Sequence, residues 1–354
     1  MSSRKTNKTP TQIGIVLTNT GSPDAPTSMA LKLFLREFLS DPRVVNYPRW
    51  VWLPILHGII LNVRPQRSAR LYQKIWKPSG SPLLDISQAQ ARSLQKYLST
   101  KIPNPIDVIP GMRYGRPSIS ESLDALLQQG SNHILIFPLY PQYSCATSES
   151  IFDAVKLAVD GQANPIKLRV IPHYHNHPAY IQALANSVRD HWANKGKAER
   201  LLISFHGIPQ SYIRAGDPYG EQCSTTSSLL AEALGLESNE WYVAFQSRFG
   251  PQAWLQPYTN STLINWGRAG AKQVDVICPG FSADCLETLY EIQHEGRDLF
   301  INSGGEALRY IPALNDQSDH ILALGEIILD YIHNWKSVTD SRVPLASQQE
   351  IPES

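Results

Sequence analysis

Cysteine is scarce in this sequence, with four residues among 354 and no C-x-x-C pair. The four positions, Cys145, Cys223, Cys278 and Cys285, show no paired spacing, which excludes a disulfide framework and a zinc ribbon. Such sparing use of cysteine is typical of a reducing compartment. The opening segment, MSSRKTNKTPTQ, has no apolar core of a secretory signal. We therefore expect a cytoplasmic location.

Long apolar runs are also absent. The longest, WVWLPILHGIILNV at 50–63, is too short to cross a membrane, because a spanning helix needs about 20 residues. Basic and acidic residues number 32 and 31, so the net charge of +1 excludes the basic face that nucleic-acid binding requires. Neither G-x-G-x-x-G nor G-x-x-x-x-G-K-[ST] occurs, and we expect no bound nucleotide. The length predicts about two domains.

Short β-branched runs alternate with helix-length segments along the chain. Continuous apolar strands with helices between them are typical of parallel sheets covered on both faces. The prediction is therefore an α/β fold of two similar lobes, each a four-stranded parallel sheet flanked by helices. The runs lie at 13–19, 106–110, 134–140 and 168–172 in the first half and at 201–205, 242–246, 274–278 and 308–312 in the second.

The predicted domain boundaries follow from these runs. The first lobe covers 12–175. The second lobe covers 176–336 and ends in a closing helix that begins near Asp316. We expect residues 1–11 to be a flexible N-terminus and the polar segment 337–354 to be a mobile tail.

A histidine directly follows the first strand of the second lobe. His206 comes after LLISF and stands in a turn set by Gly207 and Pro209. Ligands of open parallel sheets bind beyond the carboxyl ends of the strands. A histidine at such a place can serve as a metal ligand or as a base near neutral pH. The alternative is a histidine that only hydrogen-bonds the turn.

Carboxylates gather after the third strand of the same lobe. Asp284, Glu287 and Glu291 are spaced i, i+3 and i+7, which predicts one face of a helix. No Lys or Arg occurs between Lys272 and Arg297 to compensate them. Stacked acids repel one another, so they need a cation or raised pKa values. The row predicts a site for a divalent metal or for protons, with an exposed acidic face as the alternative.

Three other features are open to a functional and to a structural interpretation. The histidines of HYHNH at 173–177 could bind a metal from one face of an extended segment, or they could lie in a solvated loop. Arg113 and Tyr114 suit an anionic or aromatic ligand, or a core tyrosine beside a surface arginine. Residues 50–63 are either core or an exposed apolar lip for a ligand or a membrane surface. The apolar side chains of this lip are Trp50, Trp52, Leu53, Ile55, Leu56, Ile59, Ile60 and Leu61.

Several long segments resemble the ferrochelatase family, in the family's order. ISFHGIPQSYIRAGDPYGEQC at 203–223 matches the segment around the family's catalytic histidine. SRFGPQAWLQPYTNSTL at 247–263, CPGFSADCLETLYEI at 278–292 and the opening block at 17–45 also match. The resemblance covers about 12–335. It implies a chelatase-type fold of two Rossmann-like lobes with the active-site cleft between them.

The resemblance also implies an activity: insertion of Fe²⁺ into protoporphyrin IX to form protohaem, the terminal step of haem synthesis. Protoporphyrin IX and ferrous iron would be the substrates, and no cofactor would be bound permanently. His206 and Glu287 match the family's catalytic and metal-binding residues. Which of the two binds iron first and which deprotonates the porphyrin stays open. Asp284 and Glu291 match supporting acids, and the residues that match porphyrin-binding positions are Tyr72, Arg113, Tyr114, Trp254 and Thr20.

The cysteines depart from part of that family. Some members hold a [2Fe–2S] cluster on one mid-chain cysteine and three in a C-terminal extension. Cys145 matches the mid-chain position, but no cysteine follows Cys285. Such a cluster needs four cysteine thiolates. We therefore expect no iron–sulfur cluster.

Two other functions compete with this one. A coproporphyrin III ferrochelatase would take a substrate with four propionates instead of two, and the apolar lip favours the more lipophilic protoporphyrin. A non-catalytic haem or metal carrier is the alternative of another class, and the uncompensated acid row argues against it. The lip also predicts peripheral contact with the inner membrane. The sequence predicts no particular oligomeric state.

Overall fold

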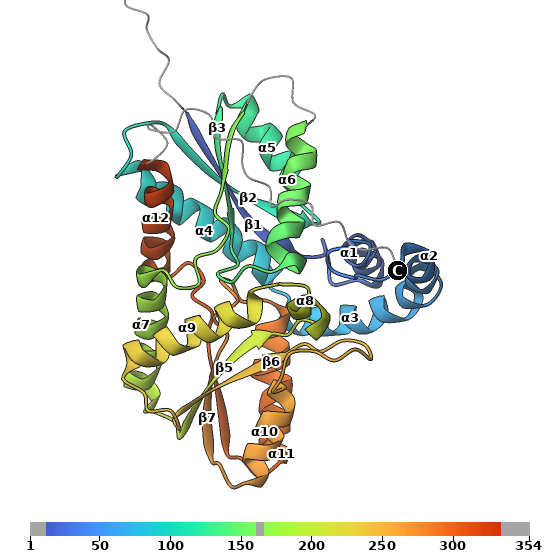
Figure 1. Ribbon diagram of the computed structural model, residues 1–354, viewed down its shortest axis with the longest axis vertical. Helices are drawn as coiled ribbons and strands as arrows, with labels where there is room; N and C mark the ends of the chain where they lie inside the picture. The colour runs from blue at the N-terminus through green and yellow to red at the C-terminus, as the bar shows by residue number, and fades with distance from the viewer. Residues whose placement is uncertain (1–11, 161–165, 334–354) are drawn as a thin grey trace, which may run out of the picture.

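Two parallel β-sheets of four strands each lie at the centre of the structure (Figure 1). The computed structural model describes residues 12–160 and 166–333. The first sheet has the strand order β2-β1-β3-β4 and the second β6-β5-β7-β8, which is the same topology. All eight predicted strands are present, so the prediction of two α/β lobes is confirmed. The strands are β1 (Ile13–Gly21), β2 (Ile106–Tyr114), β3 (His133–Pro138), β4 (Lys167–Val170), β5 (Arg200–His206), β6 (Trp241–Gln246), β7 (Gln273–Ile277) and β8 (Ala307–Ile311).

The first strand shows why these segments pair. β1 is buried along almost its whole length, as expected for a central strand whose sheet is covered on both faces. Ile13 of β1 lies opposite both Ile106 and His133. β1 and β2 run further than predicted, to Gly21 opposite Tyr114. A Cβ on Gly21, whose φ is +100°, would lie 1.8 Å from the Tyr114 carbonyl oxygen, so only glycine fits there.

Helices surround both sheets and join the lobes. Helix α12, the predicted closing helix, packs on both α7 and α4. One core cluster contains side chains of both sheets, among them Leu17, Phe137 and Ile203, so the lobes share a core that holds the carboxyl ends of the two sheets together. The predicted flexible ends, 1–11 and 337–354, lie outside the described residues. The helices of the first half are α1 (Ser28–Leu39), α2 (Arg49–Ile55), η1 (Leu56–Ile60), α3 (Leu61–Ile75), α4 (Pro82–Ser99), α5 (Ile119–Gln128), η2 (Cys145–Glu149) and α6 (Ser150–Asp160). Those of the second half are α7 (Pro178–Lys195), α8 (Gln210–Arg214), α9 (Tyr219–Leu234), α10 (Thr259–Arg268), η3 (Glu287–Gly296), α11 (Arg297–Asn302) and α12 (Ser318–His333). The η elements are π-helices.

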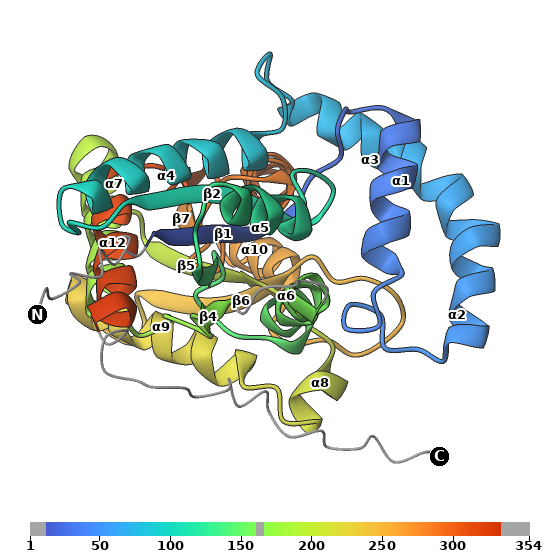
Figure 2. The same ribbon diagram turned by 90° about the horizontal axis from the view of Figure 1, so that it is seen from above.

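Helices α1, α2 and α3 project from one side of the lobes as an arm (Figure 2). The predicted lip at 50–63 lies in this arm, within α2, η1 and the start of α3. Trp50 and Ile59 are 81% and 61% exposed. Trp52 is only 7% exposed, and its Nε1 donates to the Leu39 carbonyl oxygen at 2.7 Å.

The lip therefore has an exposed face and a buried face, and its contact with a ligand or a membrane stays a prediction. The outer face is exposed, whereas Trp52, Leu56 and Leu61 of the inner face belong to the core of the arm. The sequence left core and exposed lip open as alternatives, and for this inner face the structure shows core. Within residues 12–160 and 166–333, none of the helices combines the length and the apolar character needed to cross a membrane.

Candidate active site

A cavity of about 310 Å³ lies between the lobes, beyond the carboxyl ends of the strands. Ligands of open parallel sheets bind at this place, and small-molecule pockets have volumes of about 300–1,000 Å³. Asp284 is the one predicted site residue that does not line the cavity. The predicted residues that do line it are Thr20, Tyr72, Arg113, Tyr114, His206, Trp254, Glu287 and Glu291.

His206 is the last residue of β5 and lines the cavity. Its Nδ1 lies 2.6 Å from the Gly207 carbonyl oxygen. Because a carbonyl only accepts, Nδ1 must carry a proton, and the Nε2 of the neutral ring keeps a free lone pair. The Tyr219 hydroxyl donates to the His206 carbonyl oxygen at 2.9 Å and holds the backbone. The histidine thus bonds the turn and also offers a base or ligand atom.

Glu287 and Glu291 lie on the π-helix η3, which follows β7. The side chain of Gln246, the last residue of β6, donates from Nε2 to the Glu287 carbonyl oxygen at 2.8 Å. Ser204 Oγ in turn donates to Gln246 Oε1 at 2.7 Å. A buried chain of hydrogen bonds from the sheet therefore fixes the first turn of the π-helix.

The two glutamates form an acidic pair at the cavity wall. Burial, and then the charge of Glu287, raise the pKa of Glu291 from its ordinary value of 4.5 to about 8. The Ser247 hydroxyl donates to Glu291 and opposes this shift. Ser247 has a φ of +64°, an unusual backbone conformation for a serine that directs its hydroxyl to the carboxylate. The pair is suited to hold a proton or a cation.

Arg64 from α3 lines the same cavity and corrects the prediction of uncompensated acids. Burial lowers the pKa of Arg64, and the charges of Glu291 and Glu287 oppose that effect. The guanidinium also lies over the Phe249 ring, 4.6 Å from its centroid. One cation thus lies near the acid pair, supplied from the arm and not from the acids' own helix.

Asp284 lies in the turn before the π-helix and is 7% exposed. Its carboxylate accepts hydrogen bonds from Thr288 Oγ1 at 3.0 Å, Tyr310 Oη at 2.7 Å and Asn315 Nδ2 at 2.8 Å. The predicted single helix face for the acid row is therefore wrong, because the helix begins at Glu287. Asp284 fastens the start of η3 to the second lobe instead of facing the cavity.

The first lobe and the arm supply most of the opposite wall. Burial, and then the charge of Glu287, raise the pKa of Tyr72 well above its ordinary value, so this phenol stays neutral. Thr20 Oγ1 is hydrogen-bonded to the Tyr140 hydroxyl. Trp254 also lines the cavity, and its ring centroid lies 6.3 Å from that of His206. These neutral and aromatic groups help to make the cavity lining mostly apolar.

Comparison with known proteins identifies the family of the chain. A family model described as Ferrochelatase matches residues 12–331. This chain belongs to the ferrochelatase family. A ferrochelatase from Nitrosococcus oceani is 51% identical over 92% of this chain and 88% of its own length. Ferrochelatase 1 of Shewanella oneidensis is 50% identical over 92% of this chain and 97% of its own length.

Membership of the ferrochelatase family makes the chain a porphyrin metal chelatase, an enzyme of haem synthesis that inserts iron into a porphyrin. Among solved structures, SirB from Bacillus subtilis with Fe³⁺ has a TM-score of 0.55 at 12% identity. The match covers 93% of this chain and 99% of SirB. At this identity it supports the fold alone, and the fold is that of a two-lobed chelatase.

Two residues that line the cavity, Ser247 and Arg64, were not among the predicted site residues, and the sequence indicates only the first of them. Ser247 directly follows β6, so the rule that strand ends carry ligands already pointed to its segment. Arg64 had no such signal, because it lies on an arm helix whose placement depends on tertiary packing.

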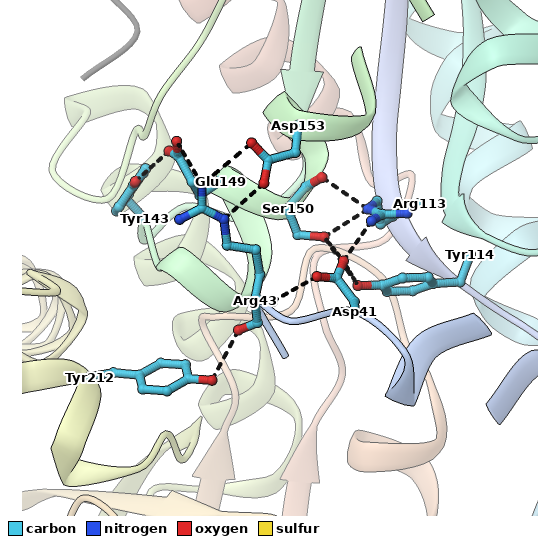
Figure 3. Close-up of polar contacts among 9 residues, drawn as sticks. All are labelled: Asp41, Arg43, Arg113, Tyr114, Tyr143, Glu149, Ser150, Asp153 and Tyr212. Carbon is cyan, nitrogen blue, oxygen red and sulfur yellow. Dashed lines mark hydrogen bonds and ion pairs between the residues drawn. The ribbon is translucent and has the colours of Figure 1, made fainter. Parts of the chain in front are cut away.

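Arg113 and Tyr114 line the cavity, but Arg113 Nε and Nη2 and the Tyr114 hydroxyl already have protein partners (Figure 3). Tyr114 is 2% exposed and donates to Asp41 Oδ2 at 2.8 Å. The same oxygen accepts from Arg113 Nη2 at 2.5 Å. The tyrosine is core, and the arginine reaches the cavity with its charge met by Asp41; binding of a ligand by this pair stays a prediction.

The histidine run at 173–177 does not converge on one point. The rings of His173 and His175 lie 5.0 Å apart. His177 instead caps α7, accepting from the Ala179 backbone N–H at 3.3 Å. Over the described ranges, no three His, Cys, Asp or Glu side chains are grouped as a metal site.

Proposed function

We propose that the cavity binds protoporphyrin IX and that the chain inserts Fe²⁺ into it to form protohaem. The observation that carries this proposal is that a histidine with a free Nε2 lone pair and a pair of glutamates line one cavity in a member of the ferrochelatase family. Metal insertion needs a group that takes pyrrole protons and oxygen ligands that receive a hydrated divalent ion. His206, Glu287 and Glu291 supply both.

In the proposed mechanism His206 accepts a pyrrole proton at Nε2. The Gly207 carbonyl holds the proton on Nδ1, so the tautomer with a basic Nε2 is set before the porphyrin arrives. Glu287 receives the iron as substrate, because a divalent cation relieves the repulsion between Glu287 and Glu291. Two N–H protons leave for each Fe²⁺ that enters. His206 takes one, and a carboxylate of the Glu287–Glu291 pair takes the other as the iron passes from the pair into the ring, so the net charge of the macrocycle does not change.

The proposed supporting groups act on this pair and on the ring. Asp284 and Ser247 hold the π-helix and the Glu291 carboxylate in place. Tyr72, Tyr114, Trp254 and Thr20 form walls against the macrocycle. We propose that Arg64 faces the substrate carboxylates, since it is a cation at the arm side of the cavity.

The test is anaerobic incubation of the purified chain with Fe²⁺ and either protoporphyrin IX or coproporphyrin III, followed by absorbance. We expect the haem spectrum with protoporphyrin IX and kcat/KM at least about tenfold lower with coproporphyrin III. The reverse preference would assign the chain as a coproporphyrin III ferrochelatase. Binding of porphyrin or iron without turnover would indicate a carrier and overturn the proposal.

We also propose that the chain holds no iron–sulfur cluster. In support, no three cysteines are grouped as a metal site over the residues that the structure describes, and Cys223, Cys278 and Cys285 are buried while Cys145 is half-buried. Burial and the nearby Asp217 raise the pKa of the Cys145 thiol to about 11, which disfavours a ligating thiolate. The purified protein should be colourless. Iron and acid-labile sulfide in a near 1:1 ratio would contradict this.

We propose that the chain works in the cytoplasm and touches the inner membrane through the outer face of the lip. Trp50, Ile59 and Val63 are 81%, 61% and 69% exposed, and they lie on the arm that projects from the lobes (Figure 2). Apolar burial is worth about 25 cal/mol per Å², so three such side chains suffice for weak, reversible attachment. With a net charge of +1, that attachment should depend little on salt.

Vesicle flotation tests this contact. Replacing Trp50 and Ile59 by serine should weaken flotation with phospholipid vesicles and leave the melting temperature unchanged, because both side chains are exposed. The matched control is Trp52→Ser, which removes a buried ring and should cost about 3 kcal/mol of stability. Equal flotation of the double variant and the wild type would remove the proposal.

A further inference from the structure

A buried carboxylate neutralises the arginine at one wall of the cavity (Figure 3). Arg113 Nη2 lies 2.5 Å from Asp41 Oδ2, and Arg113 Nε donates to Ser150 at 2.9 Å to the carbonyl oxygen and 2.7 Å to Oγ. Arg113, Tyr114 and Ser150 line the cavity, whereas Asp41 lies behind them. The cationic residue at this wall is therefore part of an ion pair before any substrate arrives.

The other contacts of Asp41 keep its carboxylate ionised. Its Oδ2 also accepts from Ser150 Oγ at 2.6 Å, and its Oδ1 accepts from the Arg43 backbone N–H at 2.7 Å. Burial alone would raise the pKa of Asp41, but the hydrogen bonds from Ser150, Tyr114 and Arg43, together with the Arg113 charge, hold it below its ordinary value. Asp41 is therefore ionised, and the pair with Arg113 carries no net charge.

The segment that carries Asp41 is held on two further sides. The Arg43 side chain donates from Nε to Asp153 Oδ2 at 2.8 Å, which fastens it to α6 (Figure 3). The Tyr212 hydroxyl of α8 donates to the Arg43 carbonyl oxygen at 3.0 Å, which fastens it to the second lobe. Asp41 thus stays with Arg113. The neighbouring Val44 and Val45 line the cavity, so the wall beside the ion pair is apolar.

We propose that Asp41 determines specificity: by neutralising Arg113 it makes this wall unfavourable for a substrate carboxylate and favours a porphyrin with two propionates over one with four. This inference rests on the proposed function. A porphyrin with a propionate on each pyrrole presents a carboxylate to every wall of its pocket. Protoporphyrin IX carries its two propionates on adjacent pyrroles and can turn its vinyl side to the wall of Arg113. A carboxylate there would lose water without gaining a free cation.

Asp41→Asn tests the proposal, because it removes the charge and nearly keeps the shape. The variant releases the Arg113 charge to the cavity. We expect the KM for coproporphyrin III to fall, so that the preference for protoporphyrin IX over coproporphyrin III in kcat/KM shrinks at least about tenfold. The kcat for protoporphyrin IX should change little, since neither residue touches the acid pair or His206. A preference that stays within about twofold of the wild type would overturn the proposal.

Two further variants separate the effect of the Arg113 charge from an effect on folding. Asp41→Asn combined with Arg113→Gln leaves a neutral wall and should restore the wild-type preference. A double variant whose preference for protoporphyrin IX shrinks at least about tenfold relative to the wild type would overturn the proposal. This comparison holds even if the single variant does not fold. The control is Asp298→Asn, which breaks the exposed pair with Arg297 outside the cavity and should leave the preference unchanged. A wild type that metallates neither porphyrin would overturn the proposed function instead, and this inference with it.

Discussion

After the third strand of each lobe comes a π-helix, η2 in the first lobe and η3 in the second. Each carries glutamate, but the surroundings differ. Glu149 of η2 accepts from the Tyr143 hydroxyl at 2.6 Å and lies 3.8 Å from the Arg43 guanidinium. Glu287 and Glu291 of η3 lie together at the cavity. The same local geometry therefore holds one glutamate paired with Arg43 in the first lobe and two neighbouring glutamates with Arg64 nearby in the second.

The central strands show a similar division. β1 ends at the cavity with Thr20 and Gly21 and is followed by the arm of α1 to α3, whereas β5 ends with His206 and is followed only by the short α8 before α9. The first lobe thus contributes Arg113 and Tyr114, which bond Asp41, and its arm contributes Arg64 and Tyr72. The second lobe contributes the groups that can exchange protons or bind a cation. Shape and chemistry are divided between two copies of one topology.

We expect the largest loss of iron insertion from a change in the second lobe. His206→Ala should lower iron insertion by about 100-fold or more, because it removes the basic Nε2. It should leave the melting temperature unchanged, because within the described residues the ring hydrogen-bonds only its own turn. Anaerobic insertion assays and thermal unfolding check both. His173→Ala, an exposed histidine outside the cavity, is the control. Near-native turnover of His206→Ala would remove the assigned base.

Asp284→Ala should lower the stability of the fold more than a substitution of a cavity-lining residue would. The change leaves Thr288, Tyr310 and Asn315 without their shared acceptor and should cost about 3 kcal/mol of unfolding free energy. Urea unfolding measures it. Asp298→Ala, with a side chain 67% exposed, should cost almost nothing. Equal stability of the two variants would show that Asp284 does not anchor η3.

Glu291→Gln should alter the pH dependence of stability. The folded-state pKa of Glu291 is raised to about 8, so its contribution is fully present below about pH 4.5 and is lost as pH rises through 8. The wild type should therefore lose melting temperature relative to Glu291→Gln between these values, measured without iron. Glu295→Gln, at an exposed position on the same helix, should follow the wild type. Parallel curves for all three proteins would contradict the raised pKa.

The smallest effect is expected in the first lobe. Glu149→Gln removes a carboxylate from a π-helix, as a change of Glu287 does, but its charge is already met by Arg43. Iron insertion should stay within about threefold of the wild type. A loss of insertion as large as that of His206→Ala in the same assay would show that a first-lobe carboxylate takes part in the reaction. It would contradict the assignment of the reactive groups to the second lobe.

The fold and the chemical centre could be predicted from the sequence because local patterns carry them. Apolar runs marked the eight strands, and the residue after LLISF marked His206. The acid row is also visible in the sequence, but its i, i+3 and i+7 spacing predicts an α-helix that includes Asp284. The π-helix starts later, at Glu287. No pattern of spacing shows where a π-helix begins, since this depends on contacts such as that of Gln246 with the Glu287 carbonyl.

The sequence does not show which charged side chains pair across the fold. Arg64 meets the acid pair from the arm, and Asp41 meets Arg113 across 72 positions of the chain. The burial of Trp52 likewise depends on how the arm folds onto Leu39. Each of these contacts joins residues far apart in the sequence or on different elements, so composition and periodicity do not determine them.

Glu287→Gln tests the division between the lobes most directly, with porphyrin binding and iron insertion measured on one preparation. The change removes a charge of the second lobe and leaves the first-lobe walls intact. We predict that the Kd for protoporphyrin IX, from fluorescence titration, stays within about twofold of the wild type while anaerobic insertion falls about 100-fold or more. Insertion within about threefold of the wild type, or a loss of binding as large as the loss of insertion, would contradict the account.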